Sequence, residues 1–208
     1  MVSQREVWDA IAQQWFHFRQ RPFPDIVRWL EKFSKEWKKG KLLEIGCGNC
    51  RNLLVFARAG FDCYGIDFSK EMLKYARYFA KKHHIAVKLK LAEATNLPFL
   101  EKSFDYILCI AVLHHLQGEK ARIKALKEIW RVLKPGGEAF ISVWNKLSWR
   151  WLFRAKERYI AWRVKDKTYM RYYYLFWPWE IERLLKQIGF KIEARQLFSK
   201  NICFLVKK

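Results

Sequence analysis

The stretch Lys41–Cys50, KLLEIGCGNC, combines a short apolar strand, an acidic residue and two glycines, and the helix-like run RNLLVFARAG follows it. A strand that turns into a helix through glycines lets backbone amides approach a bound ligand. A second carboxylate, Asp67, ends the next strand-like segment, FDCYGIDFS. It follows the glycines by about 20 residues, the spacing at which an acidic side chain reaches the hydroxyls of an adenosyl ribose. The two segments together predict a nucleoside-binding site.

The residues of the glycine loop distinguish two classes of cofactor. Dinucleotide sites favour G-x-G-x-x-G, whereas this loop has Glu44, Gly46 and Gly48, followed by Cys50. We therefore expect S-adenosylmethionine instead of NAD. The E-x-G-x-G form resembles the first motif of the class I S-adenosylmethionine-dependent methyltransferases, in which a third glycine is common where this chain has Cys50.

Strand-like and helical segments alternate along the chain, which predicts a parallel sheet with crossover helices. The expected strands are 41–45, 62–66, 87–91, 106–110 and 138–143, and the expected helices are 50–59, one that begins after Ser69, and 119–132. A later helix at 179–188 precedes a hairpin at 190–198 and 202–207. The resemblance implies an α/β Rossmann-like sheet of seven mostly parallel strands, with helices on both faces and an antiparallel C-terminal strand.

The length of 208 residues fits one α/β domain, and no Pro-, Gly- or Ser-rich linker divides the chain. Apolar residues from Val7 to Phe18 recur with helical spacing, and a second helix is expected after Pro24. We expect a single methyltransferase domain over 1–208, with N-terminal helices in 1–38 and an acceptor-side insertion at 144–178.

The charge is strongly positive, because 41 Lys and Arg residues face 20 Asp and Glu residues, for a net charge of +21. This excess favours a polyanionic partner, with a generally basic surface as the alternative. The five cysteines, without a secretory leader before them, predict a reducing, cytoplasmic location. The longest apolar run, Tyr106–Leu113, is too short to cross a bilayer, so we expect no membrane span.

Cys47 and Cys50 form a C-x-x-C pair, which suits a redox centre, half of a metal site or a structural role. No second pair and no nearby histidine supplies four ligands, so we favour the structural role and expect no metal.

The resemblance implies roles for residues at the carboxyl ends of the strands, where ligands of this fold gather. Glu44 would anchor the loop and the methionine amino group, and Asp67 would take the ribose hydroxyls. Glu93 and Ala94, in the stretch AEATNLPF, would bind the adenine amine and a ring nitrogen, although Glu93 also fits a solvated loop position. The full expected cofactor set is Glu44, Gly46, Cys47, Gly48, Asn49, Asp67, Phe68, Met72, Glu93, Ala94 and Ile110. By contrast, Asp105 is expected to be structural.

Further stretches resemble the tRNA methyltransferases that esterify 5-carboxymethyluridine at the wobble position, and the resemblance spans nearly the whole chain. They are WDAIAQQWFHFRQRPFP (8–24), CIAVLHHL (109–116), SVWN (142–145), RYYYLF (171–176) and NICFLV (201–206). Phe23, Tyr174 and Ile202 depart from the residues that are frequent in that family.

The resemblance implies an acceptor side made of the paired arginines, the two histidines His114 and His115, and aromatic residues. We expect catalytic roles for His115, Arg19 and Arg171, and substrate-binding roles for Arg21, Trp144, Tyr173 and Asn201. His115 can contact the acceptor directly or only shape the pocket. A carboxylate acceptor is already ionised near pH 7, so the enzyme needs alignment more than a strong base, and at most one arginine should touch that carboxylate.

Residues 148–165, SWRWLFRAKERYIAWRVK, are predicted to form a helix with one aromatic and one basic side. Such a helix suits RNA, whose phosphates bind cations and whose bases stack on aromatic rings. A membrane-surface element, as in quinone-type methyltransferases, is the alternative. Three functions therefore stay open: a tRNA wobble-uridine methyltransferase, a small-molecule or quinone methyltransferase, and a non-catalytic RNA-binding relic, which the intact cofactor motifs disfavour.

The predicted strand 85–91 alternates apolar residues with Lys88 and Lys90. At a sheet edge it would offer unpaired backbone groups to a partner strand, or the lysines would protect a free edge. The resembled family works with a small zinc-binding activator protein at this edge, so the resemblance implies such a partner here, beside tRNA.

Overall fold

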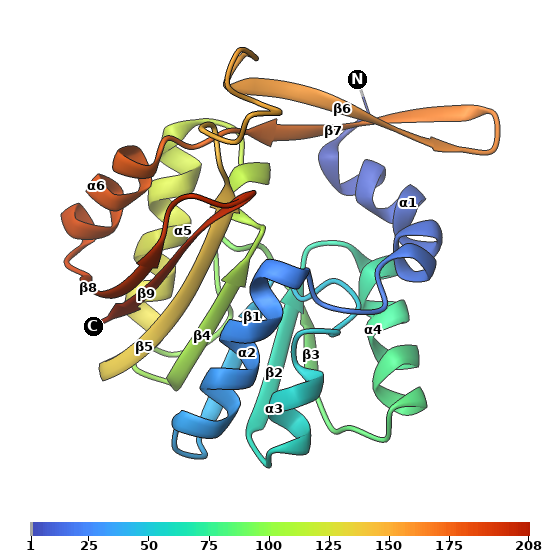
Figure 1. The fold of residues 1–208 in the computed structure, drawn as a ribbon. Coiled ribbons are helices and arrows are strands. Elements are labelled where there is room, and N and C mark those ends of the chain that lie inside the picture. Colours follow the sequence, from blue (N-terminus) through green and yellow to red (C-terminus); the bar gives the residue numbers. More distant parts are fainter. Residues whose placement is uncertain (1) are drawn as a thin grey trace.

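The computed structural model describes residues 2–208. Its centre is a seven-stranded sheet with the strand order β3-β2-β1-β4-β5-β9-β8 (Figure 1). The strands are β1 (Lys41–Ile45), β2 (Asp62–Asp67), β3 (Lys88–Leu91), β4 (Phe104–Ile110), β5 (Leu133–Trp144), β8 (Lys191–Gln196) and β9 (Asn201–Lys207). The first five are parallel, whereas β9 runs antiparallel to both of its neighbours. The expected fold class, including the closing hairpin, is confirmed.

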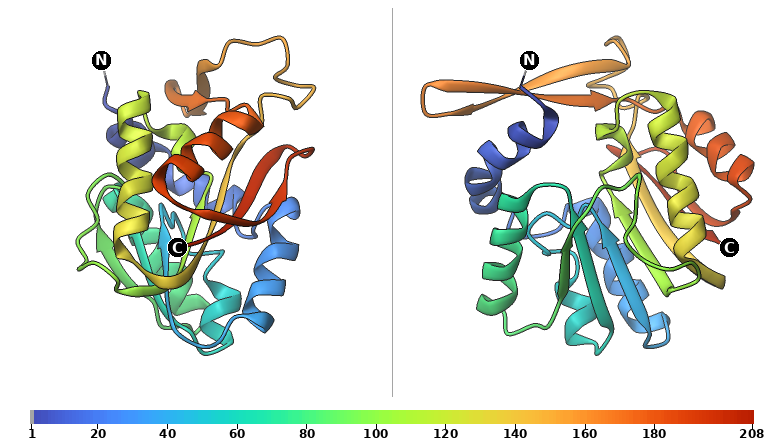
Figure 2. Two further views of the ribbon diagram at one scale, coloured as in Figure 1. Left: turned by 90° about the vertical axis from the view of Figure 1, so that its left-hand side faces the viewer. Right: turned by 180° about the vertical axis from the view of Figure 1, so that it is seen from behind.

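Helices cover both faces of this sheet (Figures 1 and 2). They are α1 (Gln4–Phe18), α2 (Pro24–Glu36), α3 (Leu54–Arg58), α4 (Lys70–Lys82), α5 (Glu119–Val132) and α6 (Pro178–Ile188), with a single 3₁₀ turn, η1 (Leu113–His115). Successive strand residues point to opposite faces. Leu42 therefore packs with α2, α3 and α4, whereas its neighbour Leu43 packs with α5 and α6. Within residues 2–208 no helix is both long and apolar enough to cross a membrane.

Local sequence signals explain several element boundaries. The Ser69 hydroxyl accepts a hydrogen bond from the amide of Met72 at 3.0 Å, so it caps α4 as expected. Asp105 has the structural role expected of it, because its carboxylate accepts from the Lys41 amide at 2.8 Å and pairs with Lys134 at 2.7 Å. These contacts fix the starts of β1 and β4 side by side.

The expected helix over 148–165 is wrong. The chain turns irregularly after Asn145 and then forms a separate hairpin of β6 (Glu157–Val164) and β7 (Lys167–Tyr174). Exposed and half-buried residues alternate along β6, with Ile160, Trp162 and Val164 on the inner face. A period of two places apolar side chains on one face of a strand, and this periodicity decides the structure. The strand period of β6 therefore outweighs the helical arrangement of an aromatic and a basic side.

The hairpin and α1 lie together at one end of the sheet (Figure 1). Gln4 of α1 joins them, because its side chain accepts from the Tyr172 amide at 2.9 Å and donates to the Met170 carbonyl at 3.1 Å. The carboxyl ends of β1, β2 and β4 point toward this assembly, so a space bounded by sheet, helix and hairpin results.

Candidate functional site

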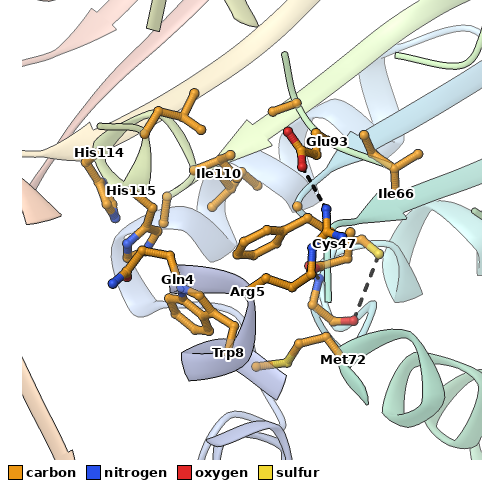
Figure 3. A pocket seen from close by; sticks show the side chains of 18 of the residues that line it. Gln4, Arg5, Trp8, Cys47, Ile66, Met72, Glu93, Ile110, His114 and His115 are labelled. Atoms are coloured by element: carbon orange, nitrogen blue, oxygen red, sulfur yellow. Dashed lines mark hydrogen bonds and ion pairs between the residues drawn. The ribbon is translucent and has the colours of Figure 1, made fainter. Parts of the chain in front are cut away.

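A cavity of about 660 Å³ lies between the carboxyl ends of the strands and α1 (Figure 3). It has two ends of different chemistry, one around the glycine loop and one around the two histidines. Twelve of the predicted site residues line it: Gly46, Cys47, Gly48, Asp67, Phe68, Met72, Glu93, Ala94, Ile110, His115, Trp144 and Tyr173. The structure therefore brings most of the predicted cofactor set and part of the predicted acceptor set into one space.

The glycine loop is held by backbone contacts to β2. The Cys47 amide donates to the Ile66 carbonyl at 2.8 Å, and the Gly48 amide donates to the Asp67 carboxylate at 2.9 Å. Gly46 has φ of +64°, and a Cβ at this residue would lie 2.5 Å from a methyl group of Val112. A side chain here would therefore be strained and would collide, so the close turn requires glycine.

Asp67 is buried at the end of β2, where its carboxylate also accepts from the Ser69 amide at 2.9 Å. Burial raises the pKa of this carboxyl to about 6, against the opposing effect of its backbone donors. The side chain borders the cavity and has acceptor oxygens for a diol.

Glu44 lies beneath the loop and is not part of the cavity wall. One carboxylate oxygen accepts from the Asn52 side chain at 2.6 Å, and the other is buried without a partner. Burial raises the pKa of Glu44 to about 8. Asn52 itself lines the cavity, so Glu44 acts on the site through it. Asn49 is also behind the wall, where its side-chain amide donates to the Arg19 backbone carbonyl at 2.8 Å.

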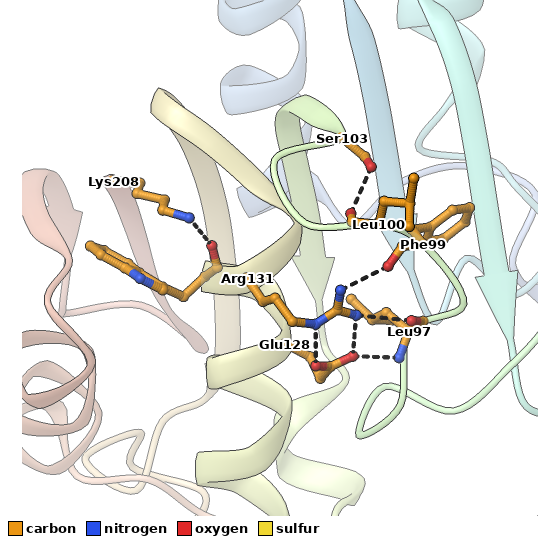
Figure 4. A network of polar contacts seen from close by, with 8 residues as sticks. Leu97, Phe99, Leu100, Ser103, Glu128, Arg131 and Lys208 are labelled. Carbon is orange, nitrogen blue, oxygen red and sulfur yellow. Dashed lines mark hydrogen bonds and ion pairs between the residues drawn. The ribbon is translucent and has the colours of Figure 1, made fainter.

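Glu93 borders the cavity from the loop after β3 and forms a 2.7 Å ion pair with Arg5 of α1. The rest of this loop is held from α5 (Figure 4). There Glu128 accepts from the Leu97 amide at 2.7 Å, and Arg131 donates to the Phe99 carbonyl at 2.8 Å. Contacts on two sides therefore position Glu93 beside the cavity.

His115 projects from η1 into the other end of the cavity. Its Nδ1 lies 2.9 Å from the Tyr172 carbonyl, and a carbonyl only accepts, so Nδ1 carries the proton. Nε2 is then an acceptor. Burial lowers the pKa of His115 to about 4, which keeps the ring neutral near pH 7. The ring packs edge-on against Trp8 and Tyr173.

His114 has the opposite arrangement. Its Nδ1 accepts from the Trp144 amide at 3.1 Å, so the proton of the neutral ring is on Nε2. That N–H is buried without a partner. Burial also holds the pKa of His114 well below its ordinary value. The two neighbouring imidazoles thus offer one donor and one acceptor, both without charge, beside the stacked rings of Trp144 and Tyr173, whose centroids are 4.2 Å apart.

Four predicted acceptor residues do not line the cavity. Arg171 is buried one layer behind it, where it donates to the Tyr173 hydroxyl at 2.7 Å and lies 4.7 Å from the Trp162 ring. Arg19 packs over the Trp15 and Phe23 rings. Arg21 is exposed, and the Asn201 side chain donates to Asp25 at 2.7 Å.

Several residues that line the cavity are not among those predicted from the sequence. Those from α1 and the glycine loop are Gln4, Arg5, Trp8, Trp15, Arg51 and Asn52. The available signal was the spacing of Arg5, Trp8 and Trp15, which places them along one side of a helix. Nothing in that spacing says that this side would face the sheet ends instead of solvent.

Comparisons with known proteins agree with this geometry. A methyltransferase-domain family model matches residues 43–141. A protein of Encephalitozoon cuniculi named as a methyltransferase is 32% identical over 205 residues, which cover 92% of this chain and 91% of that protein. The methyltransferase from Streptomyces caelestis has a similar fold, with a TM-score of 0.80 at 16% identity, over 99% of this chain and 98% of the other.

Several similar proteins are named for a tRNA substrate. The tRNA (carboxymethyluridine(34)-5-O)-methyltransferase of Arabidopsis thaliana is 36% identical over 66% of this chain, which spans only 31% of that protein. The protein of the same name from Schizosaccharomyces pombe is 27% identical, with 88% of this chain and 86% of that protein covered.

Proposed function

We propose that this chain, which belongs to the S-adenosylmethionine-dependent methyltransferases, methylates the carboxylate of a 5-carboxymethyl side chain on the wobble uridine of tRNA. The observation that carries the proposal is the uncharged donor and acceptor pair of His114 and His115 at the far end of the cofactor cavity. The similarity to two tRNA carboxymethyluridine methyltransferases supports it. A strongly basic chain supports it as well, because tRNA is a polyanion.

The residues at the glycine-loop end fit S-adenosylmethionine. Asp67 has oxygens for the ribose diol, Glu93 and the Ala94 amide border the same space, and the turn at Gly46 leaves room that a side chain would fill. Glu44 fits a role beneath the loop, with its unpartnered oxygen held close to the wall by Asn52. When bound, this cofactor supplies a methyl group activated by a sulfonium.

At the acceptor end the chain would orient a carboxylate without neutralising it. The Nε2–H of His114 donates to one carboxylate oxygen and leaves the other free as the nucleophile. Because His114 is neutral, it orients the anion without the full charge of a cation, which would reduce the nucleophilicity of the carboxylate. Methylation of a carboxylate by a sulfonium removes two opposite charges, and a buried, weakly polar site favours such a reaction over water.

The arginines expected to be catalytic fit a supporting role in this scheme. Arg171 holds the Tyr173 hydroxyl, and Tyr173 forms part of the cavity wall. Burial among aromatic rings lowers the pKa of Arg171, although the group stays charged at pH 7. We assign Arg171 and Arg19 as positioning residues that keep the aromatic wall in place. The rings of Trp144 and Tyr173 then suit a uracil that has left its stack.

The test is transfer of labelled methyl from S-adenosylmethionine to tRNA that carries 5-carboxymethyluridine at the wobble position. Transfer of methyl to the carboxylate gives an ester, so mild alkali should release the label as methanol. Matched tRNA with an unmodified wobble uridine is the control and should take up no label. Label in the control, or alkali-stable label, would contradict the proposal and point to another acceptor atom.

A second part of the proposal concerns a protein partner. β3 lies at the edge of the sheet, as expected, and Leu91 on it is 53% exposed. An edge strand with exposed apolar residues can accept a strand from another chain. We propose that a small zinc-binding activator docks here, as in the family that the sequence resembles.

Purification of the chain from its native cells, followed by zinc analysis, tests this partner. Leu91→Glu should abolish a zinc-containing complex, because a buried carboxylate would be unpaired in the interface. Leu100→Glu, at a residue that is 82% exposed outside β3, is the matched control and should leave the complex intact. Equal recovery of the partner with both variants would show that β3 is not the docking edge.

A further inference from the structure

Two exposed aromatic residues from distant segments lie at one surface hollow outside the cofactor cavity. Trp149 is 90% exposed and Phe198 is 92% exposed, and both border a hollow of about 290 Å³. Its remaining lining residues are Asn145, Leu147, Ser148, Ser199 and Lys200. Large aromatic side chains so fully exposed to water are unusual outside interaction surfaces.

The two segments are joined by specific contacts. The Asn145 side chain donates to the Leu197 and Ser199 carbonyls at 2.8 and 2.9 Å, and the Asn145 amide donates to the Lys200 carbonyl at 3.2 Å. The segment after β5 and the turn between β8 and β9 also project to the same side of the molecule (Figure 2). The hollow is therefore fixed by hydrogen bonds between two segments whose bonded residues are 52 and 54 positions apart in sequence.

The hollow and the acceptor end of the cavity are lined by residues that are adjacent in sequence. Trp144 lines that cavity, and the ring of Trp151 stacks on it with centroids 5.5 Å apart. Asn145, the next residue after Trp144, lines the hollow. A chain molecule with one unit beside Trp144 would therefore pass its neighbouring units to this surface.

The charge of both segments is complementary to a polyanion. Residues 145–156 include Arg150 and Arg154 without any acidic residue, and the turn 197–200 contributes Lys200 and likewise has no acid. Cations interleaved with exposed aromatic rings match single-stranded nucleic acid, in which phosphates and base faces alternate.

We propose that Trp149 and Phe198 form an aromatic platform on which unpaired RNA bases next to the modified nucleotide stack. The inference rests on the proposed function for the identity of the RNA, whereas the platform itself rests on the exposure, the fixed hollow and the acid-free segments. The anticodon loop of a tRNA is single-stranded and supplies such bases on both sides of the wobble position.

The test is the affinity of Trp149→Ala and Phe198→Ala for a fluorescent anticodon stem-loop, measured by anisotropy over a series of salt concentrations. Loss of base stacking should weaken binding by roughly fivefold or more per variant, because each stacked base contributes on the order of 1 kcal/mol or more. The slope of log Kd on log salt should not change, since no phosphate contact is lost. Arg150→Gln, by contrast, should reduce that slope by about one.

Tyr78→Ala is the matched control, because Tyr78 is an aromatic residue of α4 that is 57% exposed outside the two segments. It should bind the RNA as the wild type does. If Trp149→Ala and Phe198→Ala also bind the RNA with affinities within twofold of wild type, the proposed platform is refuted. Flotation with phosphatidylglycerol vesicles gives a further outcome: binding that depends on Trp149, with unchanged RNA affinity, would assign the surface to a membrane.

The wobble-ester assay separates this inference from the proposed function. Wild-type protein that forms the ester, while both platform variants keep full RNA affinity, would refute the platform alone. Wild-type protein that forms no ester, while the variants lose RNA affinity, would support the platform and refute the proposed reaction.

Discussion

Burial shifts the pKa values of the side chains at the two ends of the cavity in opposite directions. At the glycine-loop end, burial raises the pKa of Asp67 to about 6 and that of Glu44 to about 8. At the other end, burial lowers the pKa of His115 to about 4. In both cases desolvation disfavours the charged form. The difference teaches that burial keeps Glu44 protonated and His115 neutral near pH 7, whereas Asp67, with a pKa of about 6, stays largely ionised.

Gly46→Ala should have the largest effect on the glycine-loop end. A Cβ would meet Val112 at 2.5 Å in a backbone with φ of +64°, so we expect loss of measurable S-adenosylmethionine binding by calorimetry. Gly136→Ala is the matched control, because its φ is +75° but no atom lies within 4 Å of a Cβ there. The control should lose about 1–2 kcal/mol of unfolding free energy and keep cofactor affinity. Equal cofactor affinity in both variants would show that the turn does not shape the site.

His114→Ala should affect the acceptor end alone. Loss of a hydrogen bond to a charged group should lower kcat roughly 10- to 150-fold, and S-adenosylhomocysteine affinity should stay within about twofold of wild type. Steady-state kinetics and calorimetry measure the two quantities. His17→Ala, at an exposed residue of α1, serves as the control. A parallel loss of cofactor affinity would mean that His114 supports the whole cavity and that the two ends are not separable.

Glu44→Gln should change the pH dependence of stability. The folded-state pKa of about 8 lies above the ordinary value of 4.5, so the folded chain holds a proton that the unfolded chain releases. Wild-type stability should therefore fall as pH rises from about 5 to 8, by up to about 1.4 kcal/mol per pH unit from this group. The variant keeps the acceptor for Asn52 and should lack this contribution. The measurement is urea unfolding of both proteins at several pH values. If the unfolding free energies of wild type and variant changed in parallel with pH, the prediction would be contradicted.

Arg5→Ala should have the smallest effect, because its ion pair with Glu93 is about half exposed. Such pairs contribute at most about 1 kcal/mol, so the unfolding free energy should change by less than that. We expect a change in cofactor affinity of less than about fivefold, since the pair borders the cavity. Lys32→Ala, which breaks an exposed pair on α2, should leave cofactor affinity unchanged. If Lys32→Ala changed cofactor affinity more than Arg5→Ala does, the Arg5–Glu93 pair would have no role in the site.

The glycine-loop end was predictable because its residues follow individual strands in local motifs. Gly46, Asp67 and Glu93 each take their place from the strand that precedes them, so spacing along the chain determines spacing in the sheet. Glu44 belongs to the same motif but lies behind the wall, because a strand residue points to one face only. Asn49 lies behind it because its side chain turns toward the Arg19 carbonyl.

The acceptor end was less predictable because distant segments form it. His115 follows β4 and Trp144 ends β5, but their partners come from α1 and β7. The position of α1 depends on contacts such as Gln4 with β7, which no local pattern encodes. Residues 148–165 are predicted to form a helix because one side would be aromatic and another basic, and the strand period becomes clear only over β6.

The β6–β7 segment leaves the sheet after Asn145 and returns at Phe176, and these two residues pair with each other as a β-bridge. Its two attachment points are thus adjacent, so a segment of different length closes the same gap at little entropic cost. Exchange of residues 146–175 between related chains should therefore replace the part of the cavity wall that Tyr173 supplies and leave the central sheet intact. The hairpin is thus a module whose length and sequence can change while the sheet and the glycine loop keep their geometry.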